Sequence, residues 1–273
     1  MIVFPNAKIN IGLNVISRRS DGFHNLETVF YPVKIYDILE VEEDYSSDKI
    51  SFSSTGLIID GAPENNLVVR AANMLADDFK LPGLKIHLHK QIPFGAGLGG
   101  GSADAALGLD VINRLVGLNL TEKELESYAA RLGSDCAFFV RNKPCFANGR
   151  GEQLESIDLN LDGHYIAVVK PSFGVSTAEA YRNIKPKQPE NSLRNLIKLN
   201  PQEWSGKIEN DFEASVFPLY PAIEQIRETL YDSGAFYASM SGSGSSVFGF
   251  YKERPEIKPS DFAVPTEVFV VRA

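Results

Sequence analysis

Apolar and polar residues alternate along several stretches of the chain, and this period of two predicts β-strands. The clearest stretch is 84–89, where every second residue is apolar. In the stretch 8–15 the same alternation places Lys8 and Asn10 side by side on one face of a strand. The other predicted strands span residues 23–30, 35–41, 50–52, 145–147, 164–169, 236–240, 247–250 and 268–271.

Apolar residues at intervals of three and four predict helices between these strands. One helix follows Asn66, and another begins near Ser102 and runs to about residue 116. A third follows a capping box that Thr121 and Glu124 form, and Gly133 ends it. Shorter helices are predicted for 176–181, 192–199 and 221–231. The polar segment 155–163 predicts a boundary between two α/β domains, which we place at 1–158 and 159–273.

The segment between the strand at 84–89 and the helix near Ser102 is unusually rich in glycine, with glycines at 95, 97, 99, 100 and 101. A backbone without side chains can curl around a ligand and turn several N–H groups inward. The positive end of the following helix faces the same space. A strand, a glycine loop and a helix start together predict a phosphate-binding site.

Three other interpretations of this loop are less favourable. Gly95, Gly97 and Gly100 form the G-x-G-x-x-G pattern of dinucleotide folds, but the helix after Thr121 stands where that fold needs a second strand with an acidic residue. The P-loop pattern fails because no Gly-Lys-Ser/Thr closes the loop. A purely structural turn would not need five glycines, since each costs conformational entropy on folding.

Composition and charge argue against several classes of function. The net charge of −8 argues against general nucleic-acid binding, so any positive potential for phosphate must be local. No apolar run reaches the length of a membrane helix and no signal peptide is evident, so we expect a cytoplasmic protein. Cys136 and Cys145 fit a reduced interior. His87 and His89 share a strand face with Lys85, which favours a solvated edge over a metal site.

Phosphoryl transfer needs charge neutralisation, a metal ion and a group that positions or deprotonates the acceptor. Lys8 beside Asn10 and Asp135 after the helix pair are candidates, but spacing alone does not pair them. A strand lysine is usually solvated, and an Asp after a helix is usually a cap. The Ser/Gly-rich segment 241–246 fits either a second nest of backbone donors or a plain hairpin.

Three segments together resemble the motifs of the GHMP kinases, a superfamily that includes galactokinase, homoserine kinase and mevalonate kinase. They are Pro5–Asn10 (P-x-A-K-I-N), the glycine-rich run from Pro93 to Ser102, and Gly242-Ser243-Gly244. Asp21 to Phe30 is similar to the D-G-Y/F-H-x-L-x-T-x-F signature of one branch of this superfamily, which phosphorylates 4-diphosphocytidyl-2-C-methyl-D-erythritol. The resemblance runs in order along the whole chain.

This resemblance implies ATP-dependent phosphorylation of the 2-hydroxyl of that alcohol, in the non-mevalonate route to isoprenoid precursors. It implies an α+β fold of two domains: an N-terminal domain like domain 2 of ribosomal protein S5, with a left-handed β-α-β crossover, and a ferredoxin-like C-terminal domain. The partners it implies are small molecules, namely ATP with Mg²⁺ and the cytidine diphosphate-linked methylerythritol. It implies no nucleic acid, membrane or obligate protein partner.

The resemblance also implies site residues by position. Asp135 would be the catalytic base, and Lys8 would polarise the acceptor hydroxyl and keep the Asp ionised. Ser102 is a candidate Mg²⁺ ligand. The residues implied at ATP are Asn66, Leu67, Lys90, Pro93, Phe94, Gly95, Ala96, Gly97, Leu98, Gly99, Gly100, Gly101, Ser102 and Ala103. Those implied at the acceptor are Asn10, Phe23, His24, Tyr181 and Gly242, with His24 at the cytosine edge and aromatic rings at its faces.

Some positions depart from the commonest pattern of this branch. Phe23 stands where Tyr is frequent, Ala103 replaces a second Ser, and Cys136-Ala137 replaces a frequent Val-Pro after the predicted base. None of these changes removes a charged group. Two rival functions remain open: another small-molecule kinase of the superfamily, such as a homoserine or mevalonate kinase, and a nucleotide-binding regulator without catalysis.

Overall fold

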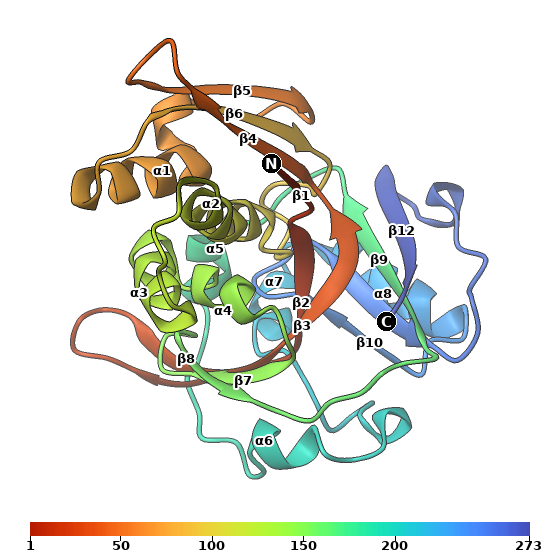
Figure 1. Cartoon of the computed structure of the whole chain (residues 1–273). Coiled ribbons are helices and arrows are strands. Elements are labelled where there is room, and N and C mark those ends of the chain that lie inside the picture. Colours follow the sequence, from red (N-terminus) through yellow and green to blue (C-terminus); the bar gives the residue numbers. More distant parts are fainter. The chain divides into compact units, whose positions relative to one another are not determined.

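The computed structural model describes residues 1–273 and divides into two compact units (Figure 1). Unit 1 comprises residues 1–7, 35–93 and 99–143, and unit 2 comprises residues 8–34, 94–98 and 144–273. Because each unit is built from three separate stretches, the units interleave along the chain. The predicted boundary between residues 158 and 159 concerns sequence domains and stays a prediction.

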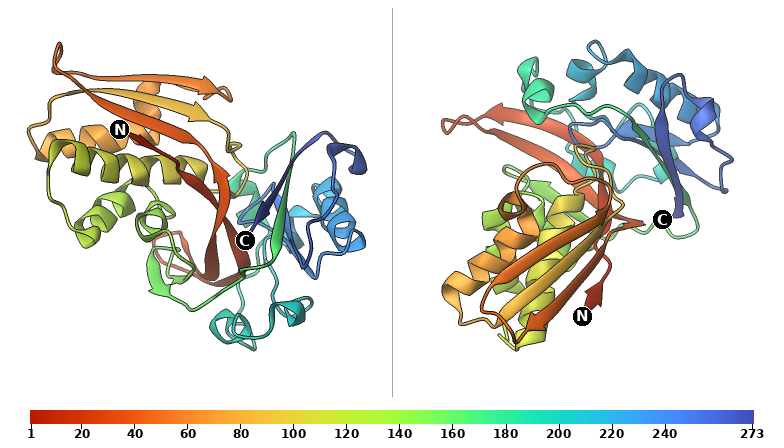
Figure 2. Two further views of the ribbon diagram at one scale, coloured as in Figure 1. Left: turned by 45° about the vertical axis from the view of Figure 1, so that its right-hand side comes forward. Right: turned by 90° about the horizontal axis from the view of Figure 1, so that it is seen from above.

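Unit 1 is a four-stranded sheet with helices on one face (Figure 2). The strand order is β1-β4-β6-β5, with β5 parallel to β6 and the other pairs antiparallel. Its elements are β1 (Ile2–Val3), β4 (Ile38–Asp44), β5 (Ile50–Gly56), η1 (Pro63–Asn65), α1 (Leu67–Asp78), β6 (Gly83–Lys90), α2 (Gly100–Val116), α3 (Glu122–Leu132) and α4 (Cys136–Arg141). The parallel strands β5 and β6 are joined through α1, as a β-α-β unit requires; the hand of this crossover stays a prediction.

The local signals of the sequence explain these elements. In β6 the side chains of Leu84, Ile86 and Leu88 are buried against α1 and α2, and the alternate residues face outward. The side chain of Asn66 caps α1, and the capping box of Thr121 and Glu124 begins α3. These predicted strands and helices are therefore confirmed.

Unit 2 holds two further four-stranded sheets. One has the order β2-β3-β7-β8, and the other has the order β10-β11-β9-β12 with every neighbouring pair antiparallel. This second order, with β9 and β10 joined through helices, is that of a ferredoxin-like sheet, although only η3 lies between β11 and β12. The strands are β2 (Asn6–Arg18), β3 (His24–Tyr36), β7 (Cys145–Asn148), β8 (Gln153–Ser156), β9 (Tyr165–Pro171), β10 (Tyr237–Met240), β11 (Val247–Tyr251) and β12 (Thr266–Arg272). The helices are α5 (Thr177–Arg182), α6 (Leu193–Leu196), η2 (Pro201–Glu203), α7 (Glu213–Val216), α8 (Pro221–Asp232) and η3 (Pro259–Asp261).

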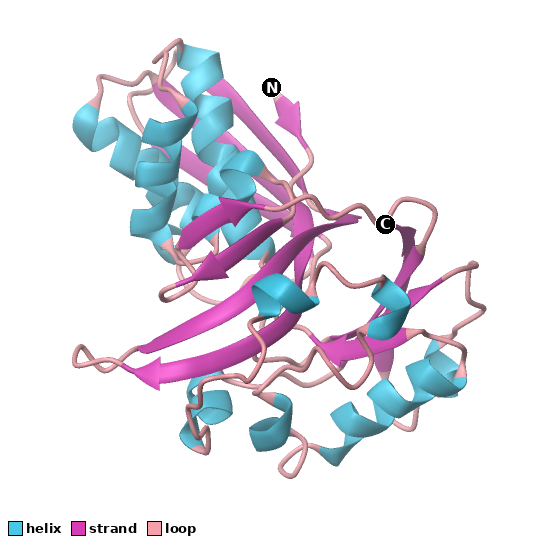
Figure 3. Cartoon of the chain, turned by 90° about the horizontal axis from the view of Figure 1, so that it is seen from below, coloured by secondary structure: helices cyan, strands magenta, loops and turns pink.

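The core of unit 2 lies between the ferredoxin-like sheet and α8, which packs along β10 and β11 (Figure 3). Ile223, Ile226 and Leu230 of α8 are the buried stripe that the sequence pattern predicts. None of the helices in either unit is long and apolar enough to cross a membrane.

Two local expectations are wrong. The strand predicted at 35–41 is two strands that break at Asp37, whose buried carboxylate binds backbone N–H groups of residues 91 and 92. The strand predicted as buried at 268–271 is only half-buried, because β12 lies at the edge of its sheet.

Candidate functional site

Lys8 and Asn10 lie side by side on β2, as their spacing predicts. The amine of Lys8 donates to Oδ1 of Asn10 at 2.6 Å and to the carbonyl oxygen of Gly97 at 3.3 Å. It also lies 5.0 Å from the ring centroid of Phe30, where the negative face of the ring stabilises a cation. Lys8 and Asn10 are each only 3% exposed, and the amide nitrogen of Asn10 donates to the hydroxyl oxygen of Thr28. Lys8 is thus a positioned ammonium group and not a solvated strand lysine.

Parts of the three motif segments of the sequence meet in unit 2. The hydroxyl of Ser241 donates to the carbonyl oxygen of Gly97 at 2.7 Å and accepts from the backbone N–H of Asn10. A Cβ on Gly97 would lie 1.9 Å from the carbonyl oxygen of Ser241, so the two backbones approach as closely as glycine allows. A Cβ on Gly242 would lie 3.2 Å from Oδ1 of Asn10. The segment 241–246 is therefore a loop that contacts both other motifs.

Asn210 holds this loop in place. Its amide nitrogen donates to the carbonyl oxygens of Met240 and Gly242 at 2.7 and 2.8 Å, and its side chain is buried. Its side-chain oxygen accepts from the backbone N–H of Phe212. Sequence reasoning missed Asn210, Ser241 and Thr28. Thr28 lies inside the decapeptide 21–30 and Ser241 precedes Gly242, whereas no sequence pattern singles out Asn210.

The start of α2 in unit 1 has the properties expected of an anion site. Its cap residue, Gly99, has φ of +70° and supplies no capping side chain, so the first N–H groups of α2 are not bonded by a cap side chain. A Cβ on Gly101 would lie 3.8 Å from Cδ1 of Leu67, which places the start of α1 beside it. Asn66 itself caps α1 by accepting from the N–H of Val68 at 2.9 Å.

Asp135 is the residue before α4 and is half-buried. The next side chain, Cys136, is buried, and Ser102 of α2 lies beside it. Burial raises the pKa of the Cys136 thiol to about 11, with the negative charge of Asp135 adding to it. The thiol is therefore neutral at pH 7 and is not a nucleophile. Its contact with Ser102 ties the segment of Asp135 to the start of α2.

Lys90 is almost fully buried between two carboxylates of unit 1. Its amine binds Asp37 and lies 2.8 Å from Oδ2 of Asp104 in α2. Oδ1 of Asp37 accepts from the N–H groups of Gln91 and Ile92 at 2.6 and 2.8 Å. Oδ1 of Asp104 has no hydrogen-bond partner. Burial raises the pKa of Asp104 to about 8, against the opposing effect of Lys90. We call Asp37, Lys90 and Asp104 the buried triad.

Two of the residues predicted to bind a cytosine, His24 and Tyr181, are in ring contact in unit 2. The rings of His24 and Tyr181 stack with centroids 4.8 Å apart and an angle of 18°, and Tyr181 also packs edge-on against Phe212. Phe23 is 55% exposed, with the guanidinium of Arg150 5.1 Å from its ring centroid. Burial and then the positive charge of Arg18 lower the pKa of His24, so its ring is neutral at pH 7 and can both donate and accept.

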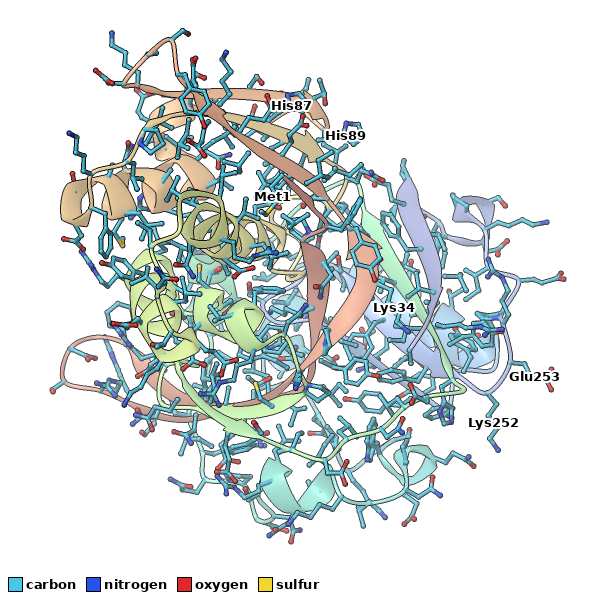
Figure 4. All side chains as sticks on the ribbon, in the orientation of Figure 1. Met1, Lys34, His87, His89, Lys252 and Glu253 are labelled. Atoms are coloured by element: carbon cyan, nitrogen blue, oxygen red, sulfur yellow. The ribbon has the colours of Figure 1, made fainter.

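The histidine pair of β6 has hydroxyl partners. His87 contacts Ser53 and Thr55, and His89 contacts Thr55, at 2.8 to 3.0 Å (Figure 4). Since β6 is an inner strand, the pair lies on an open sheet face and not at an edge. The chain has no group of three His, Cys, Asp or Glu side chains that could hold a metal ion. The role of Ser102 as an Mg²⁺ ligand stays a prediction.

Comparison with known proteins gives the family. The GHMP kinases N terminal domain family matches residues 66–143, and the GHMP kinases C terminal family matches residues 189–258. The chain is 52% identical over 258 residues to a 4-diphosphocytidyl-2-C-methyl-D-erythritol kinase of Parabacteroides distasonis, covering 94% of each chain. The chain belongs to this family of GHMP kinases. A relative from Bacteroides fragilis with the same name is also 52% identical to it, and each chain is covered to 96%.

Solved structures of GHMP kinases support the same assignment. A crystal structure of 4-(cytidine 5'-diphospho)-2C-methyl-D-erythritol kinase matches the whole chain with a TM-score of 0.80 and 30% identity, and is itself covered completely. A homoserine kinase from Cytophaga hutchinsonii matches 97% of the chain, over 93% of its own, with a TM-score of 0.61 at 19% identity. This second likeness shows the fold alone. The predicted fold and family are therefore confirmed.

The predicted site residues fall into both units. Lys8, Asn10, residues 94–98, Phe23, His24, Tyr181 and Gly242 lie in unit 2, and Asn66, Leu67, Lys90, Pro93, residues 99–103 and Asp135 lie in unit 1. Within each unit the structure brings several of them together. The pairing of Lys8 with Asp135 joins the two units and stays a prediction.

The buried triad gives a pH dependence of stability. A carboxyl whose pKa is raised on folding contributes stability that is present below its unfolded pKa, near 4, and lost as the pH rises toward 8. In Asp104→Asn this pH-dependent loss disappears, so the free energy of unfolding of the variant minus that of the native chain should increase from pH 5 to pH 8.5, whatever its value at pH 5. Urea unfolding at several pH values measures this difference. Parallel curves for the two proteins would contradict the raised pKa.

Proposed function

We propose that this chain transfers the γ-phosphoryl group of ATP to the 2-hydroxyl of 4-diphosphocytidyl-2-C-methyl-D-erythritol, giving the 2-phosphate and ADP. The observation that carries the proposal is identity of about one half, over nearly the whole chain, to relatives that bear the name of this kinase. The reaction belongs to the non-mevalonate route to isoprenoid precursors, and we expect it in the cytoplasm.

The geometry of unit 2 supports a kinase over a regulator without catalysis. A regulator has no need of a buried ammonium group, whereas Lys8 is held by Asn10, Gly97 and Phe30 at a cost in desolvation. In the proposed reaction Lys8 polarises the acceptor hydroxyl, and Asp135 takes its proton as the new O–P bond forms. Mg²⁺ bound with ATP would neutralise part of the phosphate charge.

The loop at residues 93–103 and the start of α2 would bind the phosphates. Backbone N–H groups and a helix N-terminus suit this task, because they offer donors without the bulk of side chains. In this acidic chain they also supply a local positive potential. The neutral ring of His24 would read the cytosine edge, and Phe23 and Tyr181 would contribute aromatic faces.

A panel of acceptors tests the function. We expect ADP release, measured in a coupled assay, with the cytidylyl alcohol and ATP, and none with homoserine or mevalonate. The Asp135→Asn variant should fold normally and lose turnover by about two orders of magnitude or more, because it cannot accept a proton. Turnover of homoserine or mevalonate in place of the cytidylyl alcohol would refute the proposal, as would full activity of Asp135→Asn.

Alanine substitutions at two glycines of the loop can distinguish the effect of steric crowding from the effect of backbone strain. Gly97 and Gly95 both have positive φ, but a Cβ would meet Ser241 only at Gly97 and open space at Gly95. Gly97→Ala should therefore lower kcat/KM for ATP by about a hundredfold, the typical cost of a misplacement near 1 Å. Gly95→Ala is the matched control and should lose far less. Equal losses would mean that strain alone matters.

The role of His24 has a test of its own. In the structure its ring covers one face of Tyr181, so a cytosine can stack on that face only after the His24 ring turns away. If His24 recognises the base, His24→Ala should raise the KM of the acceptor about tenfold, the value of one or two lost hydrogen bonds, and leave the KM of ATP unchanged. If His24 only covers Tyr181, calorimetry will show equal or tighter acceptor binding to the variant.

A further inference from the structure

The buried triad joins the two ends of the glycine loop. Lys90 is the last residue of β6, directly before the loop, and Asp104 lies in α2, directly after it. Their bond of 2.8 Å therefore connects the chain on either side of the loop. Asp37, between β3 and β4, binds Lys90 and also the N–H groups of the first two loop residues, Gln91 and Ile92. These side-chain bonds of the triad thus fall at the two ends of the loop.

Gly100 makes room for this arrangement. A Cβ at Gly100 would lie 2.9 Å from Nζ of Lys90 and 2.8 Å from Cγ2 of Ile92. Gly100 lies inside α2, where its φ is helical, so the reason for glycine here is space. The amine of Lys90 therefore lies beside the start of α2, where a side chain at residue 100 would collide with it.

Stability alone does not explain such a cluster. Burying two carboxyl groups and one ammonium group has a large desolvation cost, and apolar residues of similar volume often replace buried ion pairs without loss. The chain also leaves Oδ1 of Asp104 without a partner. Local features that reduce stability are expected mainly at functional sites. The amine of Lys90 is about 1% exposed and bonds both carboxylates, which leaves it poorly placed to meet a phosphate.

We propose that Asp37, Lys90 and Asp104 are positioning residues, which fix both ends of the glycine loop so that its N–H groups and the start of α2 converge on the ATP phosphates. Lys90 then acts on ATP through the two carboxylates and not by direct contact. This proposal rests on the proposed function. It differs from the interpretation of Lys90 as a phosphate ligand, because it requires the two carboxylates as much as the amine.

The test compares Asp37→Asn, Asp104→Asn, Lys90→Met and the double variant Lys90→Met/Asp104→Asn. The amide variants keep the side-chain shape and are expected to fold. Each variant should raise the KM of ATP about tenfold and leave the KM of the acceptor unchanged. A misplacement of about 1 Å can cost about a hundredfold in rate, and we expect the loop to move by less than that in these variants. The double variant should be no worse than Lys90→Met, because residues that act as a unit are not additive.

Hydrogen exchange without ATP provides a readout independent of turnover. In the amide variants the peptide covering residues 91–103 should exchange faster, whereas the rest of unit 1 should not change. Asn113→Ala is the control, since Asn113 lies on the same helix but bonds Leu120, far from the loop in sequence. It should lower stability without a local change at residues 91–103.

Two results would overturn the proposal. In the first, the KM of ATP in both amide variants equals that of the native chain and only Lys90→Met raises it. That result would make Lys90 a direct phosphate ligand. The other is exchange at residues 91–103 that does not change, or that rises only with exchange throughout unit 1. Failure of the proposed function would be distinct: the native chain would show no ADP release, while the exchange comparison would still report on the triad.

Discussion

The backbone of Ser241 approaches Gly97 so closely that only glycine fits at residue 97, and the arrangement of the site in unit 2 depends on this contact. The carbonyl oxygen of Ser241 occupies the space where any side chain at residue 97 would begin. This contact lets the hydroxyl of Ser241 and the amine of Lys8 both reach the carbonyl oxygen of Gly97. The two loops and β2 therefore form one hydrogen-bonded assembly, in which the middle of the glycine loop has a defined path.

The proposed function requires an acidic chain to attract phosphate. The positive features of the predicted site are few and local: the N-terminus of α2 without a capping side chain, and the buried amine of Lys8. Lys90, which the sequence suggests as a third positive group, is balanced by Asp37 and Asp104. In the proposed reaction, backbone dipoles and one positioned ammonium group would supply the attraction that a basic surface supplies in nucleic-acid-binding proteins.

The sequence by itself determined the local elements, the glycine loop and the family. These depend on periodicity, capping residues and motifs, which act over a few residues, and the structure confirms them in β6, α1 and α3. Tertiary structure alone decided that Asp37 binds the first residues of the glycine loop and that Asn210 binds the backbone of the loop at residues 241–246. It also decided that Lys90 lies between two carboxyl groups. Such contacts join residues tens of positions apart, and no periodicity encodes which distant polar side chain will satisfy a buried backbone group.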